Sequence, residues 1–125
     1  MLFKILKGKT IVRIDGCEVG SEKITFYEKS GRRFVLHHNQ SCCETVTLNE
    51  IIGDYADLIG SPILLAEEAS NVGAPSPRDS DCSYTWTFYK LSTIKGGVTL
   101  RWLGESNGYY SEDVDFKEID EVERN

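Results

Sequence analysis

The side chains best suited to chemistry lie close together in the first half of the chain. His37 and His38 are followed closely by Cys42 and Cys43, and Cys82 lies farther along. Imidazole and thiolate groups are the ligands that zinc prefers, usually four of them in a tetrahedron. However, adjacent histidines on a strand point to opposite faces, and the sequence contains no Cys-x-x-Cys pair. We therefore interpret these residues as a strand end beside packed thiols, and we predict no metal and no cofactor.

The same residues could supply a cysteine nucleophile. Cys42 or Cys43 beside His38 would need a third group to orient the imidazole, and Glu44 or Glu50 could serve. Any short chain with four cysteines and two histidines offers such combinations. We expect free, structural thiols, because adjacent cysteines do not bridge easily and no secretion signal is evident. The sequence therefore predicts no catalytic residue.

Paired carboxylates occur at Glu67–Glu68 and at Glu112–Asp113. General acid–base catalysis needs a carboxyl group whose pKa is raised in an enclosed cleft. Neither pair has apolar neighbours in the sequence that would enclose it, so we expect both pairs on the solvated surface.

The segment 104–111 is the best candidate for a binding site. It contains two glycines, two tyrosines and four other side chains that can form hydrogen bonds, a composition that suits a recognition loop. A well-formed β-turn explains the same residues, because Gly and Asn meet the needs of a turn backbone. Both interpretations stay open. The predicted partner-binding residues, with the acids that follow the turn, are Glu105, Ser106, Asn107, Tyr109, Tyr110, Glu112, Asp113 and Asp115.

Charge is distributed unevenly along the chain. Residues 105–125 hold eight acids and two bases, which accounts for the whole net charge of −6. Such a segment repels nucleic-acid phosphates and could attract a basic partner surface. We predict no direct nucleic-acid binding, because no basic stripe is present. No apolar run approaches the roughly 20 residues that span a bilayer, so we predict no membrane segment and a cytoplasmic location.

Strand patterns dominate the elements that would position these residues. The segments 10–14, 24–27 and 34–38 predict a first antiparallel meander. The segments 84–91 and 98–102 predict a hairpin, followed by a last strand within 109–116. We expect the aromatic side chains Trp86, Phe88 and Trp102 in the core.

The middle of the chain predicts a helix and a loop. Asn49 can cap a short helix over 50–59, and 63–68 favours a strand. The Ser-, Asp- and Pro-containing segment 70–83 predicts a mobile loop, and 117–125 an acidic tail. The sequence thus predicts one α+β, mostly β domain over residues 1–125. Its two antiparallel meanders pack as a sandwich or half-barrel, with the short helix covering one opening.

Several segments together carry a resemblance that covers nearly the whole chain. The chain resembles an uncharacterised domain family of bacteriophages and of bacteria with phage-derived genes, to which no activity is assigned. The resemblance implies a phage-type protein of the host cytoplasm and supplies no mechanism. The segments that carry it are 8–11, 57–64, 84–90, 104–111 and the element Cys42-Cys43-Glu44.

Two classes of function follow as hypotheses. The first is a non-enzymatic phage-type accessory protein that binds and modulates or inhibits a host protein, such as a defence or transcription component. A DNA mimic that uses the acids of 105–123 is a special case of it. The second is a small-ligand sponge for an anionic nucleotide signal, with Arg32, Arg33, Lys95 and Arg101 for charge and tyrosines to stack the base. An enzyme with a cysteine or metal centre is a third hypothesis, and exposed sheet edges allow a homodimer.

Overall fold

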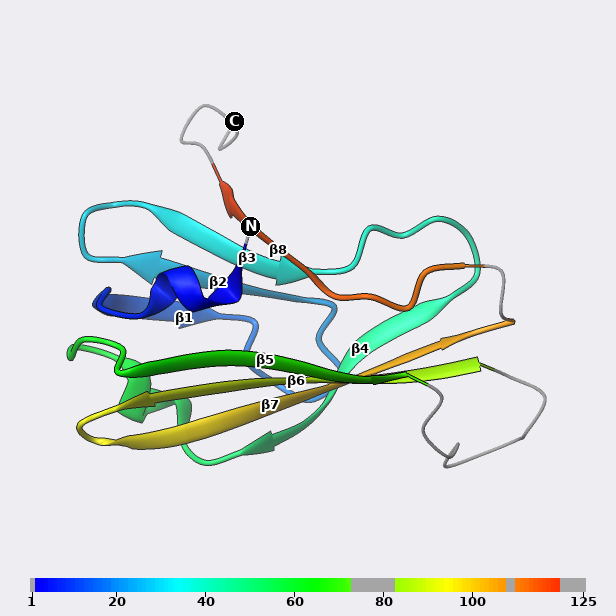
Figure 1. The fold of residues 1–125 in the computed structure, drawn as a ribbon. Coiled ribbons are helices and arrows are strands. Elements are labelled where there is room, and N and C mark those ends of the chain that lie inside the picture. The colour runs from blue at the N-terminus through cyan, green and yellow to red at the C-terminus, as the bar shows by residue number, and fades with distance from the viewer. Residues whose placement is uncertain (1, 73–82, 108–109, 120–125) are drawn as a thin grey trace.

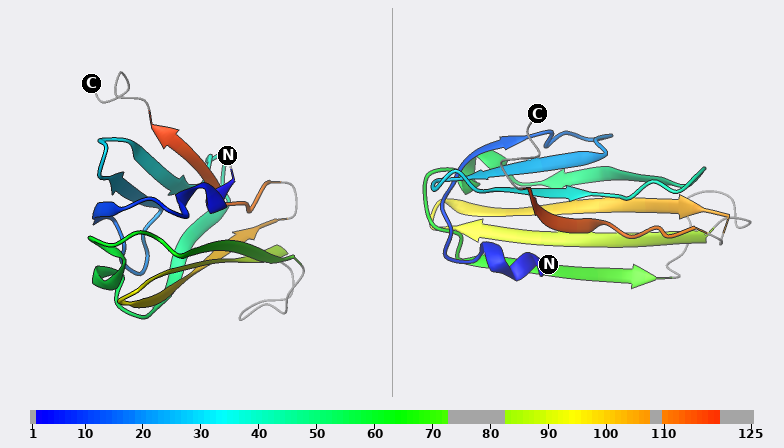
Figure 2. Two further views of the ribbon diagram at one scale, coloured as in Figure 1. Left: turned by 60° about the vertical axis from the view of Figure 1, so that its left-hand side comes forward. Right: turned by 90° about the horizontal axis from the view of Figure 1, so that it is seen from above.

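Two four-stranded antiparallel sheets face each other as the layers of a sandwich (Figures 1 and 2). The computed structural model describes residues 2–72, 83–107 and 110–119. The first sheet has the order β1-β2-β3-β8 and the second the order β4-β7-β6-β5. This architecture confirms the prediction of a mostly β fold with sandwich packing.

The elements have the following bounds. The first sheet consists of β1 (Ile11–Asp15), β2 (Lys23–Glu28), β3 (Arg33–His37) and β8 (Asp115–Ile119). The second sheet consists of β4 (Thr45–Ile52), β5 (Leu65–Val72), β6 (Ser83–Thr93) and β7 (Gly96–Ser106). Two single turns of 3-10 helix complete the described chain, η1 (Phe3–Leu6) and η2 (Tyr55–Leu58). No helix in the described part is long and apolar enough to cross a membrane.

The predicted first meander is present as β1-β2-β3, and the predicted hairpin as β6-β7. The predicted last strand differs in position and in partner. It begins at Asp115 and pairs with β3 of the first sheet, so it does not continue the β6-β7 hairpin. Phe116 then lies opposite Leu36, and the pairing extends the buried face of the first sheet by one strand.

The predicted helix over 50–59 is wrong. Residues up to Ile52 continue β4, where Ile51 lies opposite Leu100 of β7 after an irregularity between Leu48 and Glu50. Pairing with β7 favours the strand for these β-branched residues. Only one turn of 3-10 helix follows, and Asp54 caps it by accepting a hydrogen bond from the Ala56 N–H at 2.9 Å.

Three other predicted boundaries change. The strand predicted over 63–68 is observed as β5, which runs on to Val72, so residues 70–72 are not part of a loop. Residue 83 likewise begins β6, and residues 73–82 lie outside the described residues. The predicted acidic tail 117–125 overlaps β8 as far as Ile119, and 120–125 lie outside the described residues.

An aromatic cluster forms part of the apolar core between the sheets. The ring centroid of Phe3 lies 4.7 Å from that of Tyr89 and 5.2 Å from that of Phe116. Phe116 also stacks on Phe34, with centroids 5.8 Å apart. Trp102 is fully buried beside them, as predicted. Side chains from η1 and from both sheets therefore meet in one core.

The prediction that Trp86 and Phe88 are core residues is wrong. Both are only half-buried, because β6 turns its other face, with Thr85, Thr87 and Tyr89, to the interior. The guanidinium of Arg101 lies 4.8 Å from the Trp86 ring centroid on the outer face. A cation over the ring stabilises an aromatic side chain at the surface without burial in the core.

Candidate functional site

The predicted binding loop lies at one end of the sandwich, where the chain crosses from β7 to β8. Figure 1 shows this crossing at the end of the molecule where the orange β7 ends. Ser106 closes β7, and the segment 111–114 leads into the other sheet. The contacts that hold this segment in place determine which of its side chains can reach a partner.

Glu112 attaches the crossing segment to the second sheet from inside the sandwich. Only 7% of Glu112 is exposed, and its carboxylate accepts hydrogen bonds from Thr85 Oγ1 at 2.7 Å and Ser106 Oγ at 2.5 Å. A buried carboxylate is tolerated only when such donors replace water. The prediction that the Glu112–Asp113 pair is solvated is therefore wrong for Glu112, which holds two strands together.

Gly104 makes the close approach of this segment possible. A Cβ atom at Gly104 would lie 2.5 Å from the backbone oxygen of Glu112 and 2.7 Å from its Cβ. No side chain fits in that space. The glycine predicted as part of a recognition loop therefore serves packing.

A second buried carboxylate, Glu44, holds the turn of residues 41–44 on the other side of the same end of the sandwich. Its Oε2 lies 2.7 Å from His38 Nε2 and accepts from the Ser41 N–H at 2.8 Å, while its Oε1 accepts from the Cys42 N–H at 2.8 Å. The hydrogen bond from His38, with those from the backbone, lowers the pKa of Glu44 to about 2. Glu44 therefore stays ionised at neutral pH and is unsuited to act as a general acid.

His38 links this turn to the crossing segment. Its Nδ1 lies 2.6 Å from the backbone oxygen of Asp113, and a carbonyl oxygen only accepts, so Nδ1 donates. Its Nε2 faces Glu44. Because both ring nitrogens are engaged, His38 is not available to activate a nucleophile or to bind a metal.

The cysteines also differ from the prediction of free thiols. Cys42 and Cys43 form a disulfide between neighbouring residues, in the turn that the Glu44 carboxylate closes. Cys17 is a free thiol, and burial raises its pKa to about 11, which leaves it protonated at neutral pH. Cys82 lies outside the described residues. No group of metal-ligating side chains is found among the residues that the structure describes.

Between the two fastened segments lies a surface hollow of about 300 Å³, which we call the acidic recess. None of its lining residues is basic, and two are acidic: Glu105, which is partly exposed, and Glu44, whose carboxylate is buried and bonded to His38. A cleft lined by charge of one sign attracts the opposite charge. The acidic recess is lined by Cys43, Glu44, Thr45, Glu105, Ser106, Asn107 and Tyr110.

The structure divides the eight predicted binding residues. Four of them line the acidic recess: Glu105, Ser106, Asn107 and Tyr110. Glu112 lies beneath the surface, and Tyr109 lies outside the described residues. Asp113 is bonded through its backbone, its oxygen to His38 and its N–H to Ser111 Oγ, and Asp115 begins β8.

Sequence reasoning missed the contribution of residues 43–45 to the recess, because their closeness to β7 depends on the β4-β7 pairing, in which Thr45 lies opposite Glu105. One available signal was Thr85. A hydroxyl on the buried face of a strand needs a partner, and that partner is Glu112.

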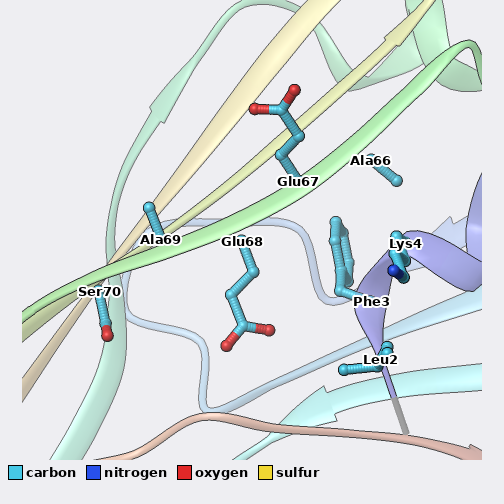
Figure 3. A pocket seen from close by; sticks show the side chains of 8 residues that line it. All are labelled: Leu2, Phe3, Lys4, Ala66, Glu67, Glu68, Ala69 and Ser70. Atoms are coloured by element: carbon cyan, nitrogen blue, oxygen red, sulfur yellow. The ribbon is translucent and has the colours of Figure 1, made fainter.

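A larger hollow of about 500 Å³ lies between η1 and β5 (Figure 3). Glu67 and Glu68 lie on opposite sides of β5, and Glu68 points toward the segment that leads into β8. Burial, with the charges of Asp113 and Asp115, raises the pKa of Glu68. The Glu67–Glu68 pair is solvent-exposed as predicted, but the environment of Glu68 differs from that of an ordinary surface carboxylate.

The four cations proposed for a nucleotide site do not come together. Arg32 binds Glu118 with nitrogen–oxygen distances of 2.9 and 2.8 Å, and Lys95 Nζ donates to the Ile59 backbone oxygen at 2.7 Å. Arg101 pairs with Glu50 at 3.2 Å across the second sheet, whereas Arg33 belongs to the first sheet. A nucleotide site would need a different set of residues.

The fold and the site together define a class of protein: an antiparallel two-sheet sandwich with an acidic recess at one end. A family model described as a domain of unknown function (DUF7448) matches residues 4–116. The chain therefore belongs to this family. No curated protein and no solved structure matches it.

Proposed function

We propose that this chain is a non-enzymatic accessory protein of phage type, which binds a host protein through the acidic recess and modulates or inhibits it. The observation that carries the proposal is the recess itself, which is lined by the partly exposed acid Glu105 and by no basic residue. Its natural counterpart is a protein surface with a protruding Lys or Arg side chain. The phage context of the proposal comes from the sequence resemblance.

The support beneath the recess favours recognition over catalysis. Glu112 and Glu44, each held by hydrogen bonds, fix the positions of Ser106 and of the 41–44 turn before any partner arrives. A preorganised surface loses less conformational entropy when it binds. The DNA-mimic version of the proposal has fewer acids available, since Glu112 is buried and Glu118 is paired with Arg32.

The test is capture of a partner from a bacterial host lysate by the tagged protein and by point variants. Deleting residues 105–125 would also remove β8 and Glu112, so a charge reversal is the cleaner probe. We expect Glu105→Lys to weaken capture at least about tenfold, equivalent to about 1.4 kcal/mol. The matched control is Glu22→Lys, the same reversal at an exposed position outside the recess.

Salt gives a second readout of the same proposal. Because the recess is acidic, the captured complex should weaken as ionic strength rises. A partner held equally by the wild type and by Glu105→Lys would contradict the placement of the binding surface. Capture of nothing by the folded wild type would contradict the proposed function.

A second candidate function is the sequestration of an anionic nucleotide signal. It is favoured by a group of basic side chains on the outer face of the first sheet, which includes Lys23 and Lys117. A panel of cyclic and linear nucleotides should then raise the melting temperature of the protein. The absence of any shift across the panel would count against this candidate.

A further inference from the structure

The outer face of the first sheet has a charge opposite to that of the whole chain. Strand pairing places four basic side chains on it, and two acidic ones, a net charge of +2 in a chain of −6. The basic residues are Arg13, Lys23, Arg33 and Lys117, and the acidic residues are Asp15 and Asp115.

A pocket of about 200 Å³ lies among these basic side chains, and we call it the cationic pocket. Its lining residues are Lys23, Val35, His37, Lys117 and Ile119, which come from β2, β3 and β8. Val35 is 1% exposed although it lies on the outer face, so it forms an apolar floor under the surrounding side chains. The two lysines come from strands on either side of β3.

One residue that lines this pocket has an unpartnered nitrogen atom. His37 Nε2 is buried and has no hydrogen-bond partner among the described residues. On the same face, outside the pocket lining, Nε and one terminal nitrogen of Arg33 are likewise buried and without a hydrogen-bond partner in the described chain. Buried polar atoms in native proteins are nearly always hydrogen-bonded. The Arg33 nitrogens therefore lack an acceptor, and so does His37 Nε2 whenever it carries a proton.

Nearby acids do not supply that acceptor. Asp15, on the strand next to β2, pairs with Arg13 at 2.8 Å and is not among the residues that line the pocket. Asp115 lies opposite His37 in the β3-β8 register, and no hydrogen bond joins their side chains in the described structure. The cationic pocket therefore has more donors and positive charges than it has acceptors.

We propose that the cationic pocket binds the phosphate group of a small soluble phosphorylated ligand, with Lys23, Lys117 and His37 as its direct contacts. A phosphate offers several strong acceptor oxygens and negative charge in one compact group. Arg33, next along β3 on the same face, is placed to contact the rest of the ligand. The second candidate function would act through this site, but phosphate binding does not depend on it.

The state of His37 gives the proposal a measurable signature. Burial, together with the charges of Lys117 and Lys23, lowers the pKa of His37, while Asp115 acts in the opposite direction. A bound phosphate adds negative charge beside the imidazole and must raise that pKa. His38 is an internal control, since Glu44 and the Asp113 backbone oxygen engage both of its ring nitrogens.

The experiment follows the imidazole signals of both histidines by NMR during titration with inorganic phosphate, with chloride at matched ionic strength as the reference. We expect the His37 signals to move and its pKa to rise, with a Kd of about 1 mM or tighter. The His38 signals should stay in place. Unmoved His37 signals at about 10 mM phosphate, ten times that Kd, would overturn the proposal.

Variants locate the site. Lys23→Gln and Lys117→Gln change exposed side chains and should each weaken phosphate binding by about threefold to tenfold. Lys29→Gln removes the same charge from an exposed turn outside the pocket and should leave binding unchanged. Equal weakening by all three variants would show a diffuse charge effect and overturn the site.

A second titration, with adenosine 5′-monophosphate, distinguishes failure of the phosphate site from failure of the nucleotide-sponge function. Tighter binding than inorganic phosphate supports both, because it shows that the pocket accepts a nucleotide. Binding no tighter than inorganic phosphate supports the phosphate site and counts against the nucleotide sponge. Failure of both ligands to move His37 overturns the site itself.

Discussion

Two regions of the sandwich interior are held together in different ways. In the aromatic region, Phe3, Phe34, Tyr89 and Phe116 pack ring against ring within the apolar core. At the end where the chain crosses to β8, which we call the polar end, the buried carboxylate Glu112 accepts hydrogen bonds from two hydroxyl groups. Apolar packing tolerates small changes of shape, whereas a buried charge needs each donor in place. Ser106 belongs both to the polar end and to the lining of the acidic recess.

The largest effect on stability should come from the aromatic region. Phe116→Ala removes a ring that contacts both Phe3 and Phe34, and it should lower the free energy of unfolding by about 3–5 kcal/mol. Urea unfolding followed by tryptophan fluorescence measures this. Phe116→Leu is the control and should cost less, because most of the volume is kept. Equal costs for the two variants would show that the cluster is not tightly packed.

Gly104→Ala should be the next most damaging change, although it adds only a methyl group. The new Cβ would lie 2.5 Å from the Glu112 backbone oxygen, so the crossing segment must move away from β7. We expect a loss of about 2–3 kcal/mol in the same unfolding assay. Gly97→Ala is the matched control, because its nearest neighbour would be 3.6 Å away. A neutral Gly104→Ala would contradict the close packing described for this end.

Glu112→Leu tests directly how much the hydrogen bonds of the polar end contribute to stability. It leaves the hydroxyls of Thr85 and Ser106 buried without their acceptor, at a cost of about 1–3 kcal/mol. Adding Thr85→Val and Ser106→Ala to the same chain should recover part of that loss, since the stranded donors are then gone. If the triple variant is no more stable than Glu112→Leu, the hydroxyls do not depend on Glu112.

The last effect depends on pH and should come from Glu44, whose contribution is complete at neutral pH and is lost in acid. Its pKa in the folded protein is about 2, below the ordinary value of 4.5. A depressed pKa contributes stability that is fully present above about pH 4.5 and is lost as the pH falls toward 2. Glu44→Gln should therefore flatten the stability profile between those pH values relative to wild type. An unchanged acid slope in Glu44→Gln would assign it to other carboxylates.

Local sequence patterns predicted part of the fold, and tertiary contacts decided the rest. Alternation of apolar residues identified β1, β2, β3, β6 and β7, because period-two patterning sets the faces of a strand. It could not tell which face of β6 is buried, since both carry aromatic side chains and Phe3, from a distant segment, selects Tyr89. Tertiary contacts also overrode the helix signal at 50–59.

The candidate site was predictable only in part. The loop residues Glu105, Ser106, Asn107 and Tyr110 were found from their types, and the structure does bring them together in one recess. Glu44 was named from the sequence only as an alternative to Glu50 for orienting His38, and the structure shows the Glu44–His38 contact. The burial of Glu44 and the role of Glu112 were not found, because a lone acidic residue in a sequence gives no sign that it is buried. Pairing of β4 with β7, and the crossing to β8, created both environments.

The return of β8 to the first sheet has a consequence for the order in which the protein folds. Arg32 and Glu118, which pair across this junction, are 86 residues apart in the sequence. During synthesis the four strands of the second sheet all leave the ribosome before β8 does, so the second sheet can form while β3 still has an open edge. Contacts of such long range slow folding, and an unpaired edge strand is prone to wrong partners. Rapid pairing of β8 therefore protects the nascent chain from wrong partners, because β8 covers the edge of β3 and places Glu112 against the second sheet.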